Sequence, residues 1–153
     1  MKTLIALAVI LAATVTLHAQ ETIESRVGVD ALVQIPGDAP TAVTHIDVPA
    51  GLWLISGQIN FYESAEHGTV FVGGNISLND VSLSTDGTTL FTSQQLDGYT
   101  NIVLGVGLPP RLVRVGTDPR VFLVGYSVQP KQPPPDCYAW GFISAQKIGV
   151  GGH

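Results

Sequence analysis

The most informative segment of this chain is Val48-Pro-Ala-Gly-Leu-Trp-Leu-Ile-Ser-Gly-Gln-Ile-Asn-Phe61. After a Pro-Ala-Gly turn, its residues alternate in character. Successive side chains of a strand point to opposite faces, so one face is wholly apolar and carries Trp53, Ile55, Gly57, Ile59 and Phe61. The other face starts with Leu52 and Leu54 and then becomes polar. The pattern predicts a long antiparallel strand with Trp53 in the core and the far end of its outer face in solvent.

The first 19 residues have the three parts of a secretory signal. Lys2 supplies a positive start, Leu4 to Val15 is apolar apart from one threonine, and Leu17-His18-Ala19 ends in a small residue. A membrane anchor or a buried helix is the alternative, but a helix of about 12 residues reaches only ~18 Å against the ~30 Å core of a bilayer. We therefore expect a signal helix over 1–19 that is cleaved after Ala19, and a secreted product without a membrane span. A domain over 20–149 and a flexible tail over 150–153 would remain.

The rest of the chain is a series of short apolar segments separated by Gly, Pro and Asp. No segment keeps a period of 3.6 residues, and about eight to ten short strands at regular spacing are typical of a sandwich or jelly roll. We predict an all-β, two-sheet antiparallel jelly-roll sandwich of about ten strands. The predicted strands cover 27–35, 43–48, 52–61, 70–78, 81–83, 88–92, 100–106, 111–115, 121–128 and 138–148.

Four other segments are interpreted as connections. Glu21 to Ser25 has the character of a polar lead-in, and Ser93 to Gly98 that of a polar loop. Pro109-Pro110 is expected to separate two strands, and Pro130 to Asp136 to form an extended loop in polyproline geometry.

The last predicted strand has no polar face. Tyr138, Trp140 and Phe142 share one face, and small apolar residues share the other. Either the strand is central and covered on both faces within one subunit, or its aromatic face packs on a neighbouring subunit. The second explanation is favoured, because three bare rings would form a large exposed patch and oligomer contacts are rich in aromatic residues.

Charge is scarce in this chain. Charged residues make up 12% of it, about half the ~25% usual in soluble domains. Its net charge is −5 and it has no basic run, which argues against nucleic-acid binding because that requires clustered Lys and Arg. With so few charges, either the polar surface is built from Ser, Thr, Asn, Gln and Gly, or a partner covers part of it.

Several segments together resemble a known family. The run Val48 to Phe61 is similar to the opening strand of small trimeric jelly-roll domains in bacteriophage tail and fibre proteins and in many bacterial proteins. Gly73 to Leu78, Pro119 to Tyr126 and Ala139 to Lys147 resemble later strands of the same family. The resemblance implies a fold like that of tumour necrosis factor or the complement globular head, a homotrimer, no enzyme activity and no cofactor. The export signal and the lack of a long N-terminal shaft favour a secreted protein over a virion component.

The lone cysteine, Cys137, has three interpretations. It is a small buried hydrophobic residue, one half of an intermolecular disulfide, or the nucleophile of a small hydrolase. The nucleophile would require an exposed thiol and a nearby base such as His45 or His67.

Metal-binding candidates are weak. Glu63, Glu66 and His67 share one turn and could hold a divalent ion, but a solvated polar turn is more common. The loop residues Asp80, Asp86, Asp97 and Asn101 lack the spacing of a calcium loop and are interpreted as turn formers.

Two tyrosines, Tyr62 and Tyr99, flank loops and are the candidate ligand contacts. They support a second functional hypothesis, a carbohydrate-binding module or lectin of the same fold. The first hypothesis is a secreted, non-enzymatic, trimeric structural or interaction module that binds a glycan or a protein through its loops. The third is the cysteine-dependent hydrolase.

Overall fold

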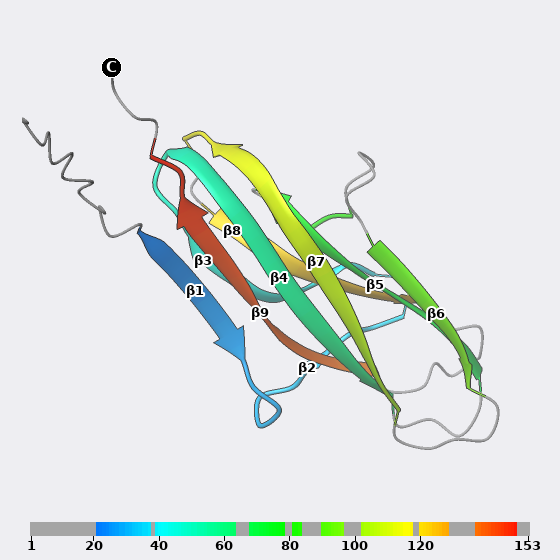
Figure 1. Ribbon diagram of the computed structural model, residues 1–153. Helices are drawn as coiled ribbons and strands as arrows, with labels where there is room; N and C mark the ends of the chain where they lie inside the picture. The colour runs from blue at the N-terminus through cyan, green and yellow to red at the C-terminus, as the bar shows by residue number, and fades with distance from the viewer. Residues whose placement is uncertain are drawn as a thin grey trace, which may run out of the picture.

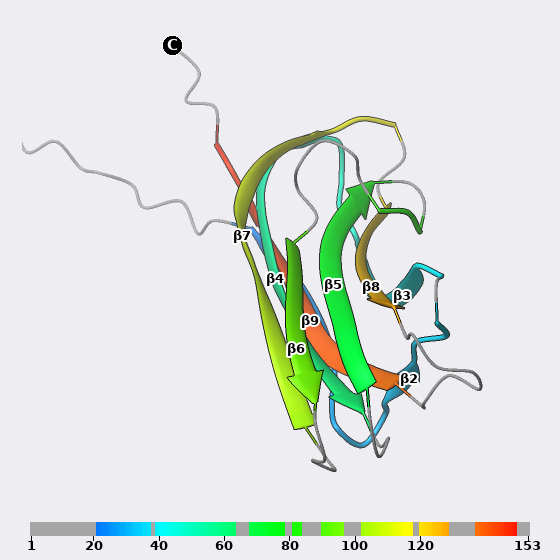
Figure 2. The same cartoon turned by 90° about the vertical axis from the view of Figure 1, so that its right-hand side faces the viewer.

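The computed structural model describes residues 21–37, 39–63, 68–78, 81–83, 90–96, 102–117, 120–128 and 137–149. They form two antiparallel sheets packed face to face (Figures 1 and 2). A five-stranded sheet has the order β1-β9-β4-β7, with β2 also paired to β9, and a four-stranded sheet has the order β3-β8-β5-β6. The strands are β1 Thr22–Val27, β2 Val33–Gln34, β3 Thr41–Asp47, β4 Gly51–Glu63, β5 Gly68–Leu78, β6 Leu90–Leu96, β7 Ile102–Val115, β8 Arg120–Val128 and β9 Cys137–Lys147.

The chain passes repeatedly between the two layers. β3, β5, β6 and β8 lie in one sheet and β4, β7 and β9 in the other, so most connections cross from sheet to sheet. Figure 2 shows the two layers nearly edge-on, with β7 and β4 of one sheet on the left and β5, β8 and β3 of the other on the right. This winding is that of a jelly roll, which confirms the predicted two-sheet antiparallel architecture. The predicted signal helix and the tail over 150–153 lie outside the described residues, and the described strands number nine rather than ten.

The core lies between the sheets and contains the predicted apolar face of β4. Trp53, Ile55, Ile59 and Phe61 are at most 2% exposed. Val121 and Leu123 of β8 meet them from the opposite sheet. The prediction that Trp53 belongs to the core is confirmed.

Contacts at one end of the sandwich hold Trp53 in place. Its indole Nε1 donates a hydrogen bond to the Pro49 carbonyl at 2.9 Å, and the Lys147 ammonium lies 5.5 Å from its ring centroid. Lys147 also pairs with Glu21 at 3.0 Å, so the two ends of the described chain meet over this tryptophan.

The N-terminal strand assignment from sequence is wrong. The run 27–35 is not one strand; it contains the end of β1, a turn and the short strand β2. Ala31 N donates to the Gly28 carbonyl at 3.1 Å in this turn, and Val29 is 68% exposed. The supposed lead-in Glu21 to Ser25 supplies most of β1 instead. Ile23 and Ser25 face the sandwich, whereas Thr22, Glu24 and Arg26 face outward.

Two further assignments around the four-stranded sheet need correction. Residues 81–83 are not a strand; Ser82 accepts a hydrogen bond from the Asn75 side chain at its carbonyl and lies 3.2 Å from Ser77 through its hydroxyl. These side-chain contacts take the place of the backbone hydrogen bonds that a strand would make with its neighbour. The next strand, β6, extends to Leu96, so the predicted polar loop from Ser93 is strand at its start.

Pro109 and Pro110 do not separate two strands but lie inside β7. The pairing of β4 with β7 shifts register between Ile55 and Gly57, opposite the proline pair, and then resumes. The prolines are tolerated because β7 is an edge strand and the bulge leaves residues unpaired there.

The described residues include no helix with the length and hydropathy needed to cross a bilayer.

Candidate functional site

The aromatic side chains of β9 lie on the outer face of the five-stranded sheet. Tyr138, Trp140 and Phe142 are half-buried, whereas Cys137 and Ala139, on the inner face, are at most 1% exposed. β9 is therefore central in its sheet and has only its inner face in the core. Within the described single chain, no second layer covers the aromatic face.

The strand register joins Tyr62 to this aromatic row. Tyr62 lies opposite Tyr138, and the neighbouring pairs are Asn60 with Trp140 and Gln58 with Phe142. Tyr62 is half-buried near the end of β4, in the same row as the predicted interface residues rather than apart from them. Tyr99, the other predicted ligand contact, lies outside the described residues.

Aliphatic side chains extend the apolar character of this face toward β7. Register places Leu112 beside Leu54 and Val103 beside Tyr62. Leu112 is 63% exposed and Val103 is 55% exposed, although both are large apolar residues. The face therefore carries apolar side chains from its centre to its β7 edge.

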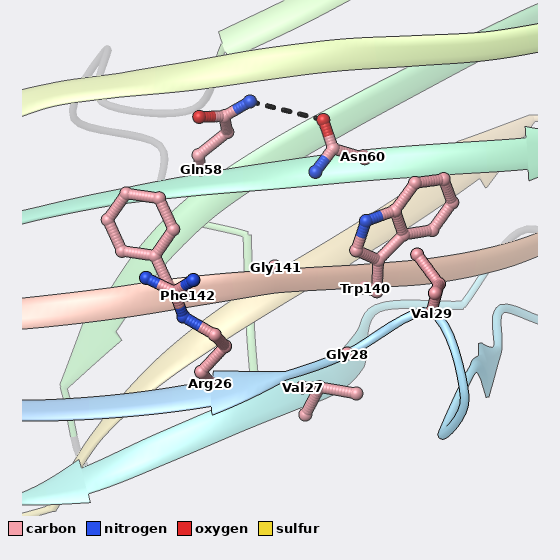
Figure 3. A pocket seen from close by; sticks show the side chains of 9 residues that line it. All are labelled: Arg26, Val27, Gly28, Val29, Gln58, Asn60, Trp140, Gly141 and Phe142. Carbon is pink, nitrogen blue, oxygen red and sulfur yellow. Dashed lines mark hydrogen bonds between the residues drawn. The ribbon is translucent and has the colours of Figure 1, made fainter.

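A groove of about 350 Å³ crosses this face between β1, β9 and β4. Figure 3 shows the rings of Trp140 and Phe142 side by side along β9, with Asn60 and Gln58 on one side and Arg26 and Val29 on the other. The Arg26 guanidinium carbon lies 5.4 Å from the Phe142 ring centroid, and its Nη2 donates to Glu24 at 3.0 Å. Across the groove, Gln58 Nε2 donates to Asn60 Oδ1 at 3.1 Å.

Chemically, the groove combines aromatic surface with uncharged amides. The Arg26 charge is paired with Glu24, and the amide pair is exposed. Such a surface can stack a flat ligand and hydrogen-bond to its edge.

Cys137 does not fit the role of a nucleophile. The residue is 1% exposed in the core cluster, so its interpretation as a small buried hydrophobic residue is confirmed, and the exposed thiol required by the hydrolase hypothesis is absent. His45, one of its candidate bases, lies in β3 of the other sheet with its ring centroid 5.8 Å from that of Phe122. The other candidate, His67, lies outside the described residues.

The metal-binding candidates are mostly beyond what the structure describes. Glu66, His67, Asp80, Asp86, Asp97 and Asn101 all fall in undescribed segments. Within the described ranges, no group of three or more His, Cys, Asp or Glu residues could hold a metal ion.

Comparison with solved structures identifies the fold. The chain is similar to the structure of Eiger TNF from S. frugiperda, with a TM-score of 0.50 and 13% identity over 88% of this chain and 96% of that chain. The chain has a TNF-like jelly-roll fold. It is also similar to a chain of the infectious bursal disease virus T13 particle (TM-score 0.52, 14% identity) and to one of the Gx strain of that virus (0.50, 13%). These alignments cover 85% and 88% of this chain but only 31% and 34% of the viral chains.

Identities at this level establish the fold alone. No protein-family model and no curated protein matches the sequence.

Sequence reasoning did not identify Arg26, Gln58 and Asn60 as parts of one site. Gln58 and Asn60 were visible as the polar end of one strand face, and Arg26 follows a segment interpreted as a lead-in. Their proximity depends on β9 lying between β1 and β4, which no local pattern reveals.

Proposed function

We propose that this chain is an exported, non-enzymatic structural or interaction module that assembles as a homotrimer through the outer face of the five-stranded sheet. The observation that carries the proposal is the half-buried aromatic row of Tyr62, Tyr138, Trp140 and Phe142 on that face. Monomeric soluble proteins rarely leave a contiguous apolar patch of this kind in water. The resemblance of the sequence to phage tail and fibre domains supports a structural or attachment role.

The size of the face suits a stable contact. β4 has 13 residues, which span about 40 Å, and four neighbouring strands cover about 19 Å. The area given by multiplying these two lengths is close to the ~800 Å² that each partner contributes to an interface of standard size.

A closed ring requires two different patches on each subunit. In a three-fold assembly, one patch of each chain meets a different patch of the next. The aromatic row on β9 and the exposed Leu112 and Val103 on β7 are two such patches on one face.

Native mass spectrometry of the exported product tests the assembly. Leu112→Glu places a charge in the proposed contact, and we expect it to convert a trimer into monomers without unfolding the chain, because Leu112 is 63% exposed in the single subunit. Phe71→Glu is the matched control. Phe71 is 44% exposed in β5 of the other sheet, so this variant should remain trimeric.

A wild-type protein that stays monomeric at micromolar concentration contradicts the proposed assembly. Equal dissociation by both glutamate variants would place the contact on another surface.

Export is tested separately by the intact mass of the secreted protein. We expect a mature chain that begins at Gln20 after cleavage behind Ala19. A full-length mass that includes Met1, or retention inside the cell, contradicts this part of the proposal.

A further inference from the structure

We propose that β4 lines the three-fold axis of the assembly, and that the amide pair of Gln58 and Asn60 forms a polar ring there which sets the register of the subunits. The inference rests on the proposed homotrimer and deepens it by naming the groups that meet at its centre. The site is incomplete in one chain, because the next copy supplies the partners of each amide pair.

The position of β4 in its sheet places it at the centre of such a ring. β4 is hydrogen-bonded to β9 on one side and to β7 on the other. If the aromatic row on β9 of one chain meets Leu112 and Val103 on β7 of the next, the strand between these two patches faces the axis. The outward residues of β4 alternate with buried ones and run from Leu52 through Gln58 to Tyr62.

The amide pair is complementary to a second copy of itself. Gln58 Nε2 donates to Asn60 Oδ1 at 3.1 Å, and this exposed pair keeps Gln58 Oε1 able to accept and Asn60 Nδ2 able to donate. The Asn60 donor of one chain can therefore meet the Gln58 acceptor of the next. A three-fold ring repeats this contact until it closes.

The neighbouring strand β7 leaves room for the approach of another chain. Gly105 lies opposite Asn60 and Gly107 lies opposite Gln58. A Cβ atom at Gly105 would lie 3.3 Å from Asn60 Oδ1, whereas one at Gly107 would meet nothing within 4 Å. Figure 3 shows the amide bond on the side of β4 away from Phe142. A second copy can thus reach the amides without meeting a β7 side chain.

A polar ring selects one register where apolar contacts do not. The attraction between apolar side chains such as Leu54 and Tyr62 has no direction, so an apolar face alone can slide or accept a different number of copies. Amides buried in a contact without partners cost free energy, which favours the one arrangement that aligns donors with acceptors. Buried polar residues fix register and the number of chains in coiled coils for the same reason.

Disulfide formation in the exported product tests whether β4 lines the axis. A residue on a three-fold axis lies beside its own copies, so Gln58→Cys should give covalent dimers under mild oxidation, detected on a non-reducing gel. The native Cys137 is 1% exposed and should not react. Gln34→Cys is the matched control. Gln34 is exposed on β2, beyond β9 and about 10 Å from β4, so its copies should lie too far apart to link.

The same two positions test the axis by charge. Gln58→Glu brings three carboxylates together and should raise the dissociation constant of the trimer at least about tenfold, measured by native mass spectrometry over a dilution series. Gln34→Glu makes the same chemical change at the edge of the sheet and should raise it less than about threefold. Both residues are exposed in the single chain, so neither substitution should disturb the fold.

A double substitution tests the role of the amides in the register. Gln58→Leu with Asn60→Leu keeps an apolar contact but removes its directed hydrogen bonds. We expect a mixture of oligomers in place of a single trimer. A double variant that remains a single trimer overturns this role.

The outcomes separate this inference from the proposed assembly. If the wild type is a trimer but Gln58→Cys does not link, or if Gln58→Glu and Gln34→Glu dissociate equally, the position of β4 on the axis is overturned and the trimer stands. A monomeric wild type contradicts the proposed assembly itself and overturns the axial ring with it.

Discussion

Gly141 lies where β9 and β4 leave no space for a side chain. A Cβ atom there would collide with the Gln58 carbonyl oxygen and lie 3.0 Å from Gln58 C and 3.1 Å from Ile59 Cα. These are backbone atoms of a central strand, so relief requires the two strands to move apart. We expect Gly141→Ala to lower the free energy of unfolding by about 3 kcal/mol or more, measured by urea denaturation.

Gly107→Ala is the control for this substitution. It adds the same methyl group on the edge strand, where nothing lies within 4 Å, and should change stability by no more than about 0.5 kcal/mol. Equal effects of the two substitutions would contradict the steric explanation.

Ser127 is a buried polar residue in the core face of β8. Its hydroxyl is fully buried and has no hydrogen-bond partner within the described structure. Because burying an unpaired hydroxyl is unfavourable, we expect Ser127→Ala to raise the free energy of unfolding by about 1 kcal/mol and to raise the melting temperature.

Ser77→Ala should change the free energy of unfolding in the opposite direction. The Ser77 hydroxyl lies 3.2 Å from the Ser82 hydroxyl, so its removal should destabilise by about 1 kcal/mol. If Ser127→Ala instead lowers the free energy of unfolding, the Ser127 hydroxyl makes a favourable contact and the prediction for Ser127 is contradicted.

At the scale of elements, β7 is a 14-residue edge strand that carries a proline pair at its bulge. Pro109 and Pro110 lack backbone N–H donors, which blunts the edge against pairing with another chain. We expect the double substitution Pro109→Thr and Pro110→Val to increase aggregation at 37 °C, followed by light scattering and thioflavin fluorescence.

Replacement of both prolines by lysine tests the same explanation. Lysine restores the N–H donors but adds charge, which also protects edge strands, so this variant should stay soluble. If the Thr-Val variant shows no more aggregation than the wild type, the prolines serve only the bulge geometry.

At the scale of the whole molecule, assembly should link stability to protein concentration. A trimer that dissociates on unfolding becomes more stable as its concentration rises. For chains of this length, we expect the melting temperature to rise by about 3 °C for each tenfold increase in concentration. Differential scanning fluorimetry over a hundredfold range measures this.

The Leu112→Glu variant provides the comparison, because a monomer should melt at the same temperature at every concentration. A wild-type melting temperature that does not depend on concentration contradicts the assembly.

Local sequence patterns were sufficient to predict the architecture and one wall of the core. The alternation around Trp53 correctly predicted a long strand with its apolar face buried, and the density of turns correctly predicted an antiparallel sandwich. The one-sided aromatic pattern of β9 was also visible, and its rings do lie on the outer face. Side-chain periodicity and turn residues are properties of neighbouring positions, so a single sequence contains them.

The tertiary structure was needed for register and for the position of each strand in its sheet. From the sequence, Pro109 appeared to end a strand. Only the fold shows that it lies within β7, which is an edge strand with a bulge. β1 appeared to be a polar lead-in because its outward residues are polar. The groove unites Arg26, Asn60 and Trp140, which come from three strands far apart in the chain. Such neighbours are set by long-range pairing between strands, whose free energy depends on all the partners together and not on any one segment.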